Sequence, residues 1–223
     1  MSKKARTLIE LSDELVSEFQ WRFSELKCLK QSLLDSKSSS QVSAVMRSGI
    51  MMLYAHFEGF VKRSGELYLQ HVSMQRIQNS KLKINFLINS VDFTIRQNGY
   101  NSIYGTKDLK QLVEYVLVNF DNRSYVQYKN VINTKSNLKF EVLKKIFDYL
   151  HLPINELILK KAKIDELVKY RNSIAHGEYL PVDKEYYIEL YQITIEIMKT
   201  IREVIEYAAN KKEYLIITDS GGL

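Results

Sequence analysis

Residues 171–177 (RNSIAHG) bring a cation, an amide and an imidazole into two turns of a predicted helix. At about 100° per residue, Asn172 and His176 share one helix face, so the Asn172 amide can orient the His176 ring. Arg171 lies about 140° from His176 around the axis. Its long side chain can curl toward the imidazole, or two such helices can meet across a two-fold axis and pool their side chains. Gly177 is expected to end this helix.

These side-chain types suit RNA cleavage without a metal ion. A neutral imidazole can take the proton from a ribose 2′-OH, an imidazolium can protonate the leaving 5′-oxygen, and a guanidinium can neutralise the pentavalent phosphate. Because one imidazole cannot easily be base and acid in one in-line displacement, we expect two subunits to contribute. The alternative is structural: Arg171 pairs with a surface carboxylate, and His176 caps its own helix, where the dipole favours a cation.

Other catalytic chemistries lack support in the sequence. Cys28 is the single cysteine, which excludes an internal disulfide framework and every zinc motif with paired thiolates, and indicates a reducing, intracellular setting. None of the four histidines has another at the i, i+4 spacing of a metal pair. No Walker loop, dinucleotide fingerprint or serine-hydrolase elbow is present. We therefore expect neither a metal nor a cofactor.

The charge of the chain is compatible with a polyanionic partner such as RNA. It has 32 Lys and Arg against 26 Asp and Glu, for a formal net charge of +6. Four lysines before or within the motif helix are candidates for holding phosphates, although a solvated basic face explains them equally well: Lys160, Lys161, Lys163 and Lys169. No signal peptide and no apolar run of about 18 residues is visible, which favours a cytoplasmic protein without a membrane span.

The elements that must position the motif are predicted to be long helices, because only 8 Gly and 2 Pro occur in 223 residues. Apolar residues recur at three-and-four spacing over four segments, which predicts an all-α, up-and-down bundle. These four core helices are expected at about residues 5–34, 41–77, 154–176 and 183–211. On the second of them, the i, i+4 pair Glu58 and Lys62 is interpreted as a surface salt bridge, with a role beside the motif as the alternative.

Residues 80–152 are interpreted as an insertion between the second and third core helices. Further helices are expected in this insertion near 107–119 and 137–150, with a loop at 97–106. We treat residues 1–211 as a single helical domain. Residues 212–223 are expected to form a frayed C-terminal tail.

The string LVKYRNSIAHGEY at residues 167–179 resembles the HEPN superfamily (higher eukaryotes and prokaryotes nucleotide-binding). The signature of that superfamily is an arginine, a polar residue, several further residues and then a histidine at the end of a helix. Arg171, Asn172 and His176 occupy these three positions. The resemblance covers about residues 41–208.

Two further segments are similar to the MAE-like branch of HEPN proteins: YAHFEGFVKRSGELYL at 54–69 and NLKFEVLKKIFDYLHLPI at 137–154. The resemblance implies an all-helical HEPN fold, a homodimer with facing R-x4-H motifs, and metal-independent endoribonuclease activity. Because this branch occurs in bacterial toxin–antitoxin and defence settings, it also implies a toxin or antiviral effector with an antitoxin or other defence-system partner. Some HEPN proteins are inactive, so a non-catalytic RNA-binding or protein-interaction module is the alternative hypothesis.

Overall fold

The computed structural model describes residues 5–97, 109–179 and 182–216. Within these ranges the regular elements are helices, and β-pairing is limited to isolated bridges. This confirms the prediction of an all-α fold. None of the helices in the described ranges is long and apolar enough to cross a membrane.

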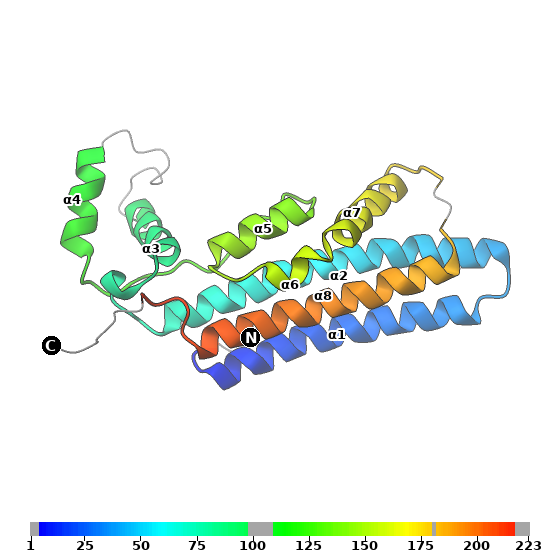
Figure 1. Ribbon diagram of the computed structural model, residues 1–223, viewed down its shortest axis with the longest axis horizontal. Coiled ribbons are helices and arrows are strands. Elements are labelled where there is room, and N and C mark those ends of the chain that lie inside the picture. Colours follow the sequence, from blue (N-terminus) through cyan, green and yellow to red (C-terminus); the bar gives the residue numbers. More distant parts are fainter. Residues whose placement is uncertain (1–4, 98–108, 180–181, 217–223) are drawn as a thin grey trace.

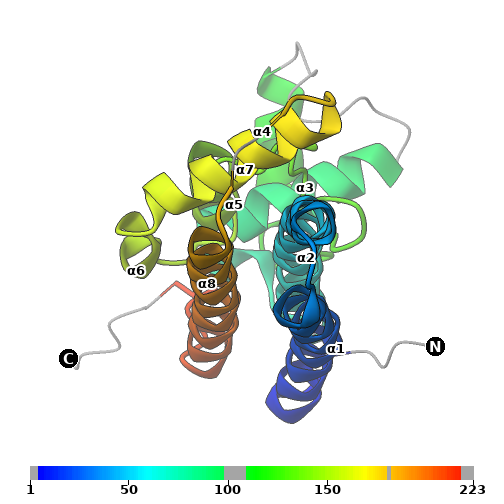
Figure 2. The ribbon, with the colours of Figure 1, turned by 90° about the vertical axis from the view of Figure 1, so that its right-hand side faces the viewer.

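Three long helices form the body of the molecule: α1 (Leu8–Asp35), α2 (Ser39–Met74) and α8 (Lys184–Asn210). They lie side by side, and each packs against the other two (Figures 1 and 2). Side chains in the sequence fix where these helices begin. The hydroxyl groups of Thr7 and Ser38 accept hydrogen bonds from the third residue of α1 and of α2, and the Asp183 carboxylate does the same for α8.

The helix that carries the motif is α7 (Lys161–Ala175), which packs on α2 and α8. The helix predicted for residues 154–176 is divided, because the short α6 (Asn155–Ile158) ends in a tight turn before α7. In that turn the Lys160 N–H donates to the Leu157 carbonyl three residues back, at 3.0 Å, and the Leu159 side chain is 91% exposed. The apolar spacing alone did not reveal this change of direction.

A glycine allows α2 and α8 to approach closely. A Cβ atom added at Gly49 would lie 2.5 Å from the Tyr187 Oη and 2.6 Å from its Cε2. Tyr187 is completely buried, so its ring has no free space to move into. Gly49 therefore lets the aromatic ring of α8 fill the space beside α2.

The region between α2 and α7 contains the 3₁₀ turn η1 (Asn79–Lys81), α3 (Ile84–Gln97), α4 (Leu109–Asn119) and α5 (Phe140–Tyr149). In Figure 1, α3 and α4 lie beyond one end of the bundle, whereas α5 lies alongside α2, near α7. Nearly all of the loop expected at 97–106 lies outside the described residues. After α4 the chain returns toward α5 as an extended segment, and it reaches α7 near residue 136.

Part of the expected C-terminal tail is ordered against the core. Tyr214 is 1% exposed, and its ring centre lies 6.4 Å from those of His71 and Phe86. Its carbonyl accepts a hydrogen bond from the Lys83 N–H at 2.9 Å. The prediction of a frayed tail is therefore wrong for this part of it, because an apolar ring there finds a buried site. Residues 217–223 lie outside the described ranges.

Candidate active site

Arg171 faces α2 and is held on three sides. Its Cζ atom lies 4.0 Å from the centre of the Tyr54 ring, which is the geometry of a cation–π contact. Its Nη2 donates to the Ser136 carbonyl oxygen at 2.7 Å, and its Nη1 donates to the Asn172 Oδ1 at 2.8 Å. Within the described part of the chain, no carboxylate forms an ion pair with Arg171. The guanidinium is thus positioned, among the described residues, without a carboxylate at ion-pair distance.

Tyr54 of α2 connects Arg171 to the segment before α5. The side chain is buried, and its hydroxyl oxygen accepts a hydrogen bond from the Leu138 N–H at 2.9 Å. Burial raises the pKa of Tyr54, and the negative charge of Glu58 raises it further. Tyr54 is therefore neutral. Its ring packs against the Arg171 guanidinium, and its hydroxyl oxygen holds the backbone at Leu138.

Glu58 does not form the salt bridge expected from the sequence. No ion pair between Glu58 and Lys62 occurs among the described residues, and the Glu58 Oε1 is buried without a hydrogen-bond partner there. Since Glu58 follows Tyr54 by one helical turn, its carboxylate lies on the side of α2 that meets the motif. Its negative charge therefore belongs to the surroundings of Arg171.

His176 is the C-cap residue that directly follows the helix that carries Arg171. The chain leaves α7 through Gly177, whose φ is +77°, and the Glu178 N–H donates to the Ser173 carbonyl at 2.9 Å. This is a Schellman ending, which confirms the role predicted for Gly177. The His176 side chain is exposed, and none of the residues that the structure describes forms a hydrogen bond with its ring. An imidazole in this position is accessible to a ligand.

His176 lines a shallow groove of about 460 Å³. Lys139, Asp165, Lys169 and Asn172 line the same groove, so both signs of charge meet there. Arg171 is not among the lining residues, because it lies on the face of α7 that meets α2. In a single chain, therefore, the groove presents the imidazole, and the guanidinium lies behind it.

Asn172 contacts Arg171 and also lines the groove of His176. Its side-chain oxygen accepts from Arg171, its Nδ2 donates to the Asn137 Oδ1 at 3.4 Å, and its atoms line the groove of His176. No hydrogen bond joins the Asn172 amide to the His176 ring among the described residues. The orienting contact that the structure shows is made to Arg171.

The four candidate RNA-binding lysines are placed differently from one another. Lys160 pairs with Glu196 at 2.8 Å, Lys161 with Asp165 at 2.9 Å, and Lys163 with Glu189 at 3.1 Å. Lys169 lines the groove together with His176. Carboxylates therefore partly neutralise three of the four, and Lys169 is the one that shares a groove with His176.

Tyr54, Ser136 and Asn137 contact the motif but were not identified from the sequence as part of it. Ser136 contributes a backbone carbonyl, which carries no side-chain signal. Tyr54 and Glu58 occur one turn apart on the second helix, within a segment that resembles HEPN proteins. That spacing was the signal available for finding them.

An all-helical bundle whose third core helix bears an arginine and ends at a histidine defines a domain of the HEPN class. The chain belongs to the RiboL-PSP-HEPN family, because the model of that family matches residues 17–207, which include the whole motif. Comparison with curated proteins and with solved structures finds no match. This match confirms that the chain is a member of the HEPN superfamily. Its assignment to the MAE-like branch stays a prediction.

Proposed function

We propose that the protein is a metal-independent endoribonuclease that acts as a homodimer. The observation that carries this proposal is the state of the two motif side chains. The Arg171 guanidinium is fixed on the Tyr54 ring without a carboxylate partner, and the His176 imidazole is exposed on a groove at the end of the same helix. A purely structural role would favour an ion pair for Arg171, and none forms within the described residues.

The proposed reaction is transesterification at phosphorus. The His176 imidazole of one subunit takes the proton from a ribose 2′-OH, and the 2′-oxygen forms a bond to the adjacent phosphorus. The bond from phosphorus to the 5′-oxygen breaks, and the His176 imidazolium of the second subunit gives that oxygen a proton. The Arg171 guanidinium stabilises the extra negative charge of the pentavalent phosphate. The products are a 2′,3′-cyclic phosphate and a free 5′-hydroxyl.

A dimer is part of this proposal because each chain contributes one motif histidine. The groove lies at the C-terminal end of α7, where His176 and Glu178 are exposed, so a second copy can approach there. Lys169 is the lysine that we assign to the RNA phosphates in this groove, while Asn172 positions Arg171. A stable monomer in solution scattering that still cleaves RNA would refute the composite site.

The direct test is incubation of the purified protein with total RNA in EDTA. We expect fragments that end in 2′,3′-cyclic phosphate. His176→Ala should reduce the rate by about 10² to 10⁴-fold, because it removes the proton-transfer group, and Arg171→Ala should reduce it comparably. Asn172→Ala should be milder. Arg96→Ala is the matched control, because it removes an arginine that is paired with Asp92 on α3, away from the motif.

The biological role that we propose is that of a toxin or antiviral effector, restrained by an antitoxin or another defence-system protein. This follows from the HEPN resemblance. Expression in a sensitive host should arrest growth, and His176→Ala should relieve the arrest. If the folded, dimeric wild-type protein cleaves no RNA, the chain is instead a non-catalytic RNA-binding or protein-interaction module.

A further inference from the structure

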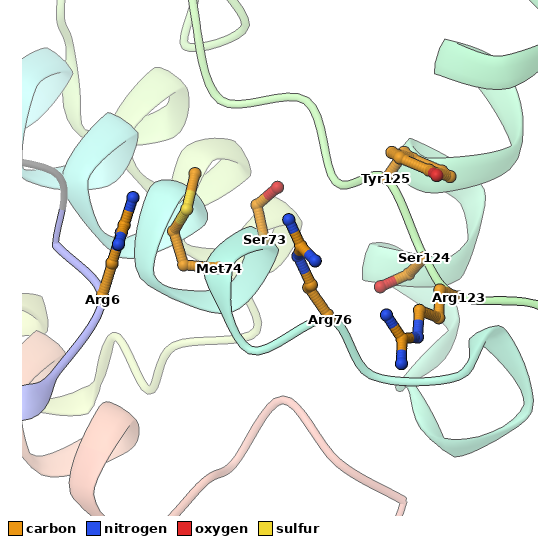
Figure 3. Close-up of a pocket in the computed structure, with 7 residues that line it drawn as sticks. All are labelled: Arg6, Ser73, Met74, Arg76, Arg123, Ser124 and Tyr125. Atoms are coloured by element: carbon orange, nitrogen blue, oxygen red, sulfur yellow. The ribbon is translucent and has the colours of Figure 1, made fainter.

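A second hollow, of about 610 Å³, lies at the C-terminal end of α2, and we call it the arginine pocket. Three segments line it (Figure 3): Arg6 precedes α1, Arg76 follows the end of α2, and residues 123–125 follow α4. About 20 residues of α2 separate Tyr54 from this end, which corresponds to about 30 Å of helix. The pocket is therefore separate from the Arg171 site.

Hydrogen bonds to backbone carbonyl groups hold the three segments together. The Gln75 Nε2 donates to the Arg6 carbonyl oxygen at 2.8 Å, which ties the N-terminal segment to the end of α2. The Ser124 N–H donates to the Ile77 carbonyl at 2.7 Å, which ties the segment after α4 to the same place. The three arginines are thus brought together by fixed main-chain positions.

One carboxylate lies near this cluster, because the Glu10 Oε2 accepts a hydrogen bond from the Arg6 N–H at 2.9 Å. Arg6, Arg76 and Arg123 form no ion pair with a carboxylate in the part of the chain that the structure describes. Four arginines elsewhere do form such pairs: Arg22, Arg63, Arg96 and Arg202. Three guanidinium groups line one pocket, and a bound anion offsets the repulsion between them.

The backbone conformation at the end of α2 also supports an anion site. Arg76 has a φ of +51°, which is the left-handed conformation that glycine or asparagine usually occupies after a helix. An arginine in this conformation costs about 1 kcal/mol relative to glycine. That cost is compensated if the guanidinium is needed at this place.

Two more side chains indicate what kind of anion fits. The Ser124 Oγ is buried and has no hydrogen-bond partner among the described residues, so it is a donor that an anion in the pocket can use. Tyr125 is 62% exposed, and its ring lies at the rim of the pocket in Figure 3. Guanidinium groups and a hydroxyl suit a phosphate, and an exposed ring beside them suits the base that a nucleotide carries.

We propose that the arginine pocket binds single-stranded RNA, with a phosphate held by Arg6, Arg76 and Arg123 and a base stacked on Tyr125. The choice of RNA rests on the proposed function, whereas the phosphate site rests on the pocket itself. At 3.4 Å per nucleotide, a stacked strand of about nine nucleotides covers the 30 Å to the motif. The pocket is thus an anchoring site for the RNA that the motif cleaves.

The test uses a fluorescein-labelled 12-nucleotide oligouridylate that is 2′-O-methylated, because its blocked 2′-oxygens prevent cleavage. Fluorescence anisotropy gives its dissociation constant over a range of salt concentrations. The variant Arg6→Gln/Arg76→Gln/Arg123→Gln should reduce the magnitude of the slope of log K against log salt by about 0.7, since the three arginines hold one phosphate and each phosphate contact on a single strand contributes about 0.7. The matched control Lys27→Gln/Lys37→Gln/Lys199→Gln removes three exposed charges outside the pocket and should leave the slope unchanged.

Tyr125→Ala should weaken binding by about 5- to 150-fold, and Tyr125→Phe should not, because stacking needs the ring and not the hydroxyl. Equal slopes for the arginine variant and the wild type, with both proteins folded, overturn the proposal. Competition by an oligoglutamate of equal charge that is as strong as competition by the unlabelled oligonucleotide also overturns it, in favour of an acidic protein partner. Binding that behaves as expected in a protein that cleaves no RNA supports the pocket and refutes only the nuclease.

Discussion

The ring and the hydroxyl of Tyr54 have separate tasks, so two substitutions can distinguish them. Tyr54→Phe keeps the ring that lies 4.0 Å from the Arg171 Cζ, but it removes the oxygen that accepts the hydrogen bond of the Leu138 N–H. Tyr54→Leu removes both. If the ring holds Arg171 in its working position, the leucine variant should lose cleavage activity that the phenylalanine variant keeps.

The expected energies follow from these contacts. Leu138 is completely buried, so leaving its N–H without an acceptor should lower the free energy of unfolding by about 1–3 kcal/mol in both variants. Loss of the cation–π contact adds about 0.5–2 kcal/mol in Tyr54→Leu. If the same energy is lost in positioning the guanidinium for the transition state, cleavage slows by about 2- to 30-fold.

The assay has two parts. Urea denaturation gives the free energy of unfolding of each variant, and release of 2′,3′-cyclic phosphate ends gives the rate, at a temperature at which both variants are folded. Tyr54→Phe serves as the control, because it shares the loss of stability but not the loss of the ring. Equal cleavage rates for the two folded variants would show that the ring does not position Arg171.

Two further predictions concern stability. Gly49→Ala should lower the free energy of unfolding by about 1–3 kcal/mol in urea denaturation, because its Cβ would overlap the buried Tyr187 ring. In a protein that also carries Tyr187→Leu, the same alanine should cost less free energy of unfolding. If the effects of the two substitutions simply add, this explanation is refuted. Burial lowers the pKa of His71 in the folded protein. As the pH falls through about 6.5, the unfolded chain therefore binds a proton at His71 while the folded chain does not. The contribution of His71 to the free energy of unfolding should be fully present above that pH and should decrease below it. His71→Phe should flatten this decline between about pH 7 and pH 5, and an unchanged slope would contradict it.

The long helices could be predicted from the sequence because their signals are local. The three-and-four spacing of Leu11, Leu15 and Phe19 specifies one buried face of α1, and caps such as Thr7 mark where a helix starts. The predicted bounds of α1, α2 and α8 therefore lie within a few residues of the observed ones.

The surroundings of the motif could not be predicted, because they depend on contacts between distant segments. The extended segment after α4 has no helical periodicity, yet Ser136 supplies the carbonyl that binds Arg171, and Asn89 of α3 holds the Gln127 N–H at 2.6 Å. A backbone carbonyl has the same chemistry in every residue, so no pattern of residue types reveals it. The motif itself could be recognised, because Arg171 and His176 are only five residues apart, on α7 and at its C-cap.

The contact of α8 and Tyr214 with the rest of the core also constrains the order in which a newly made chain can become functional. A ribosome synthesises Arg171 and His176 before α8, which packs against α1, α2 and α7, and before Tyr214, which contacts the far end of α2 and α3. Domains complete their cores only when all of their packing partners have been made. A nascent chain that has exposed the motif therefore still lacks one side of the core that supports it. If the protein is the nuclease proposed above, this delay keeps a partly synthesised chain from cleaving the RNA from which it is being translated.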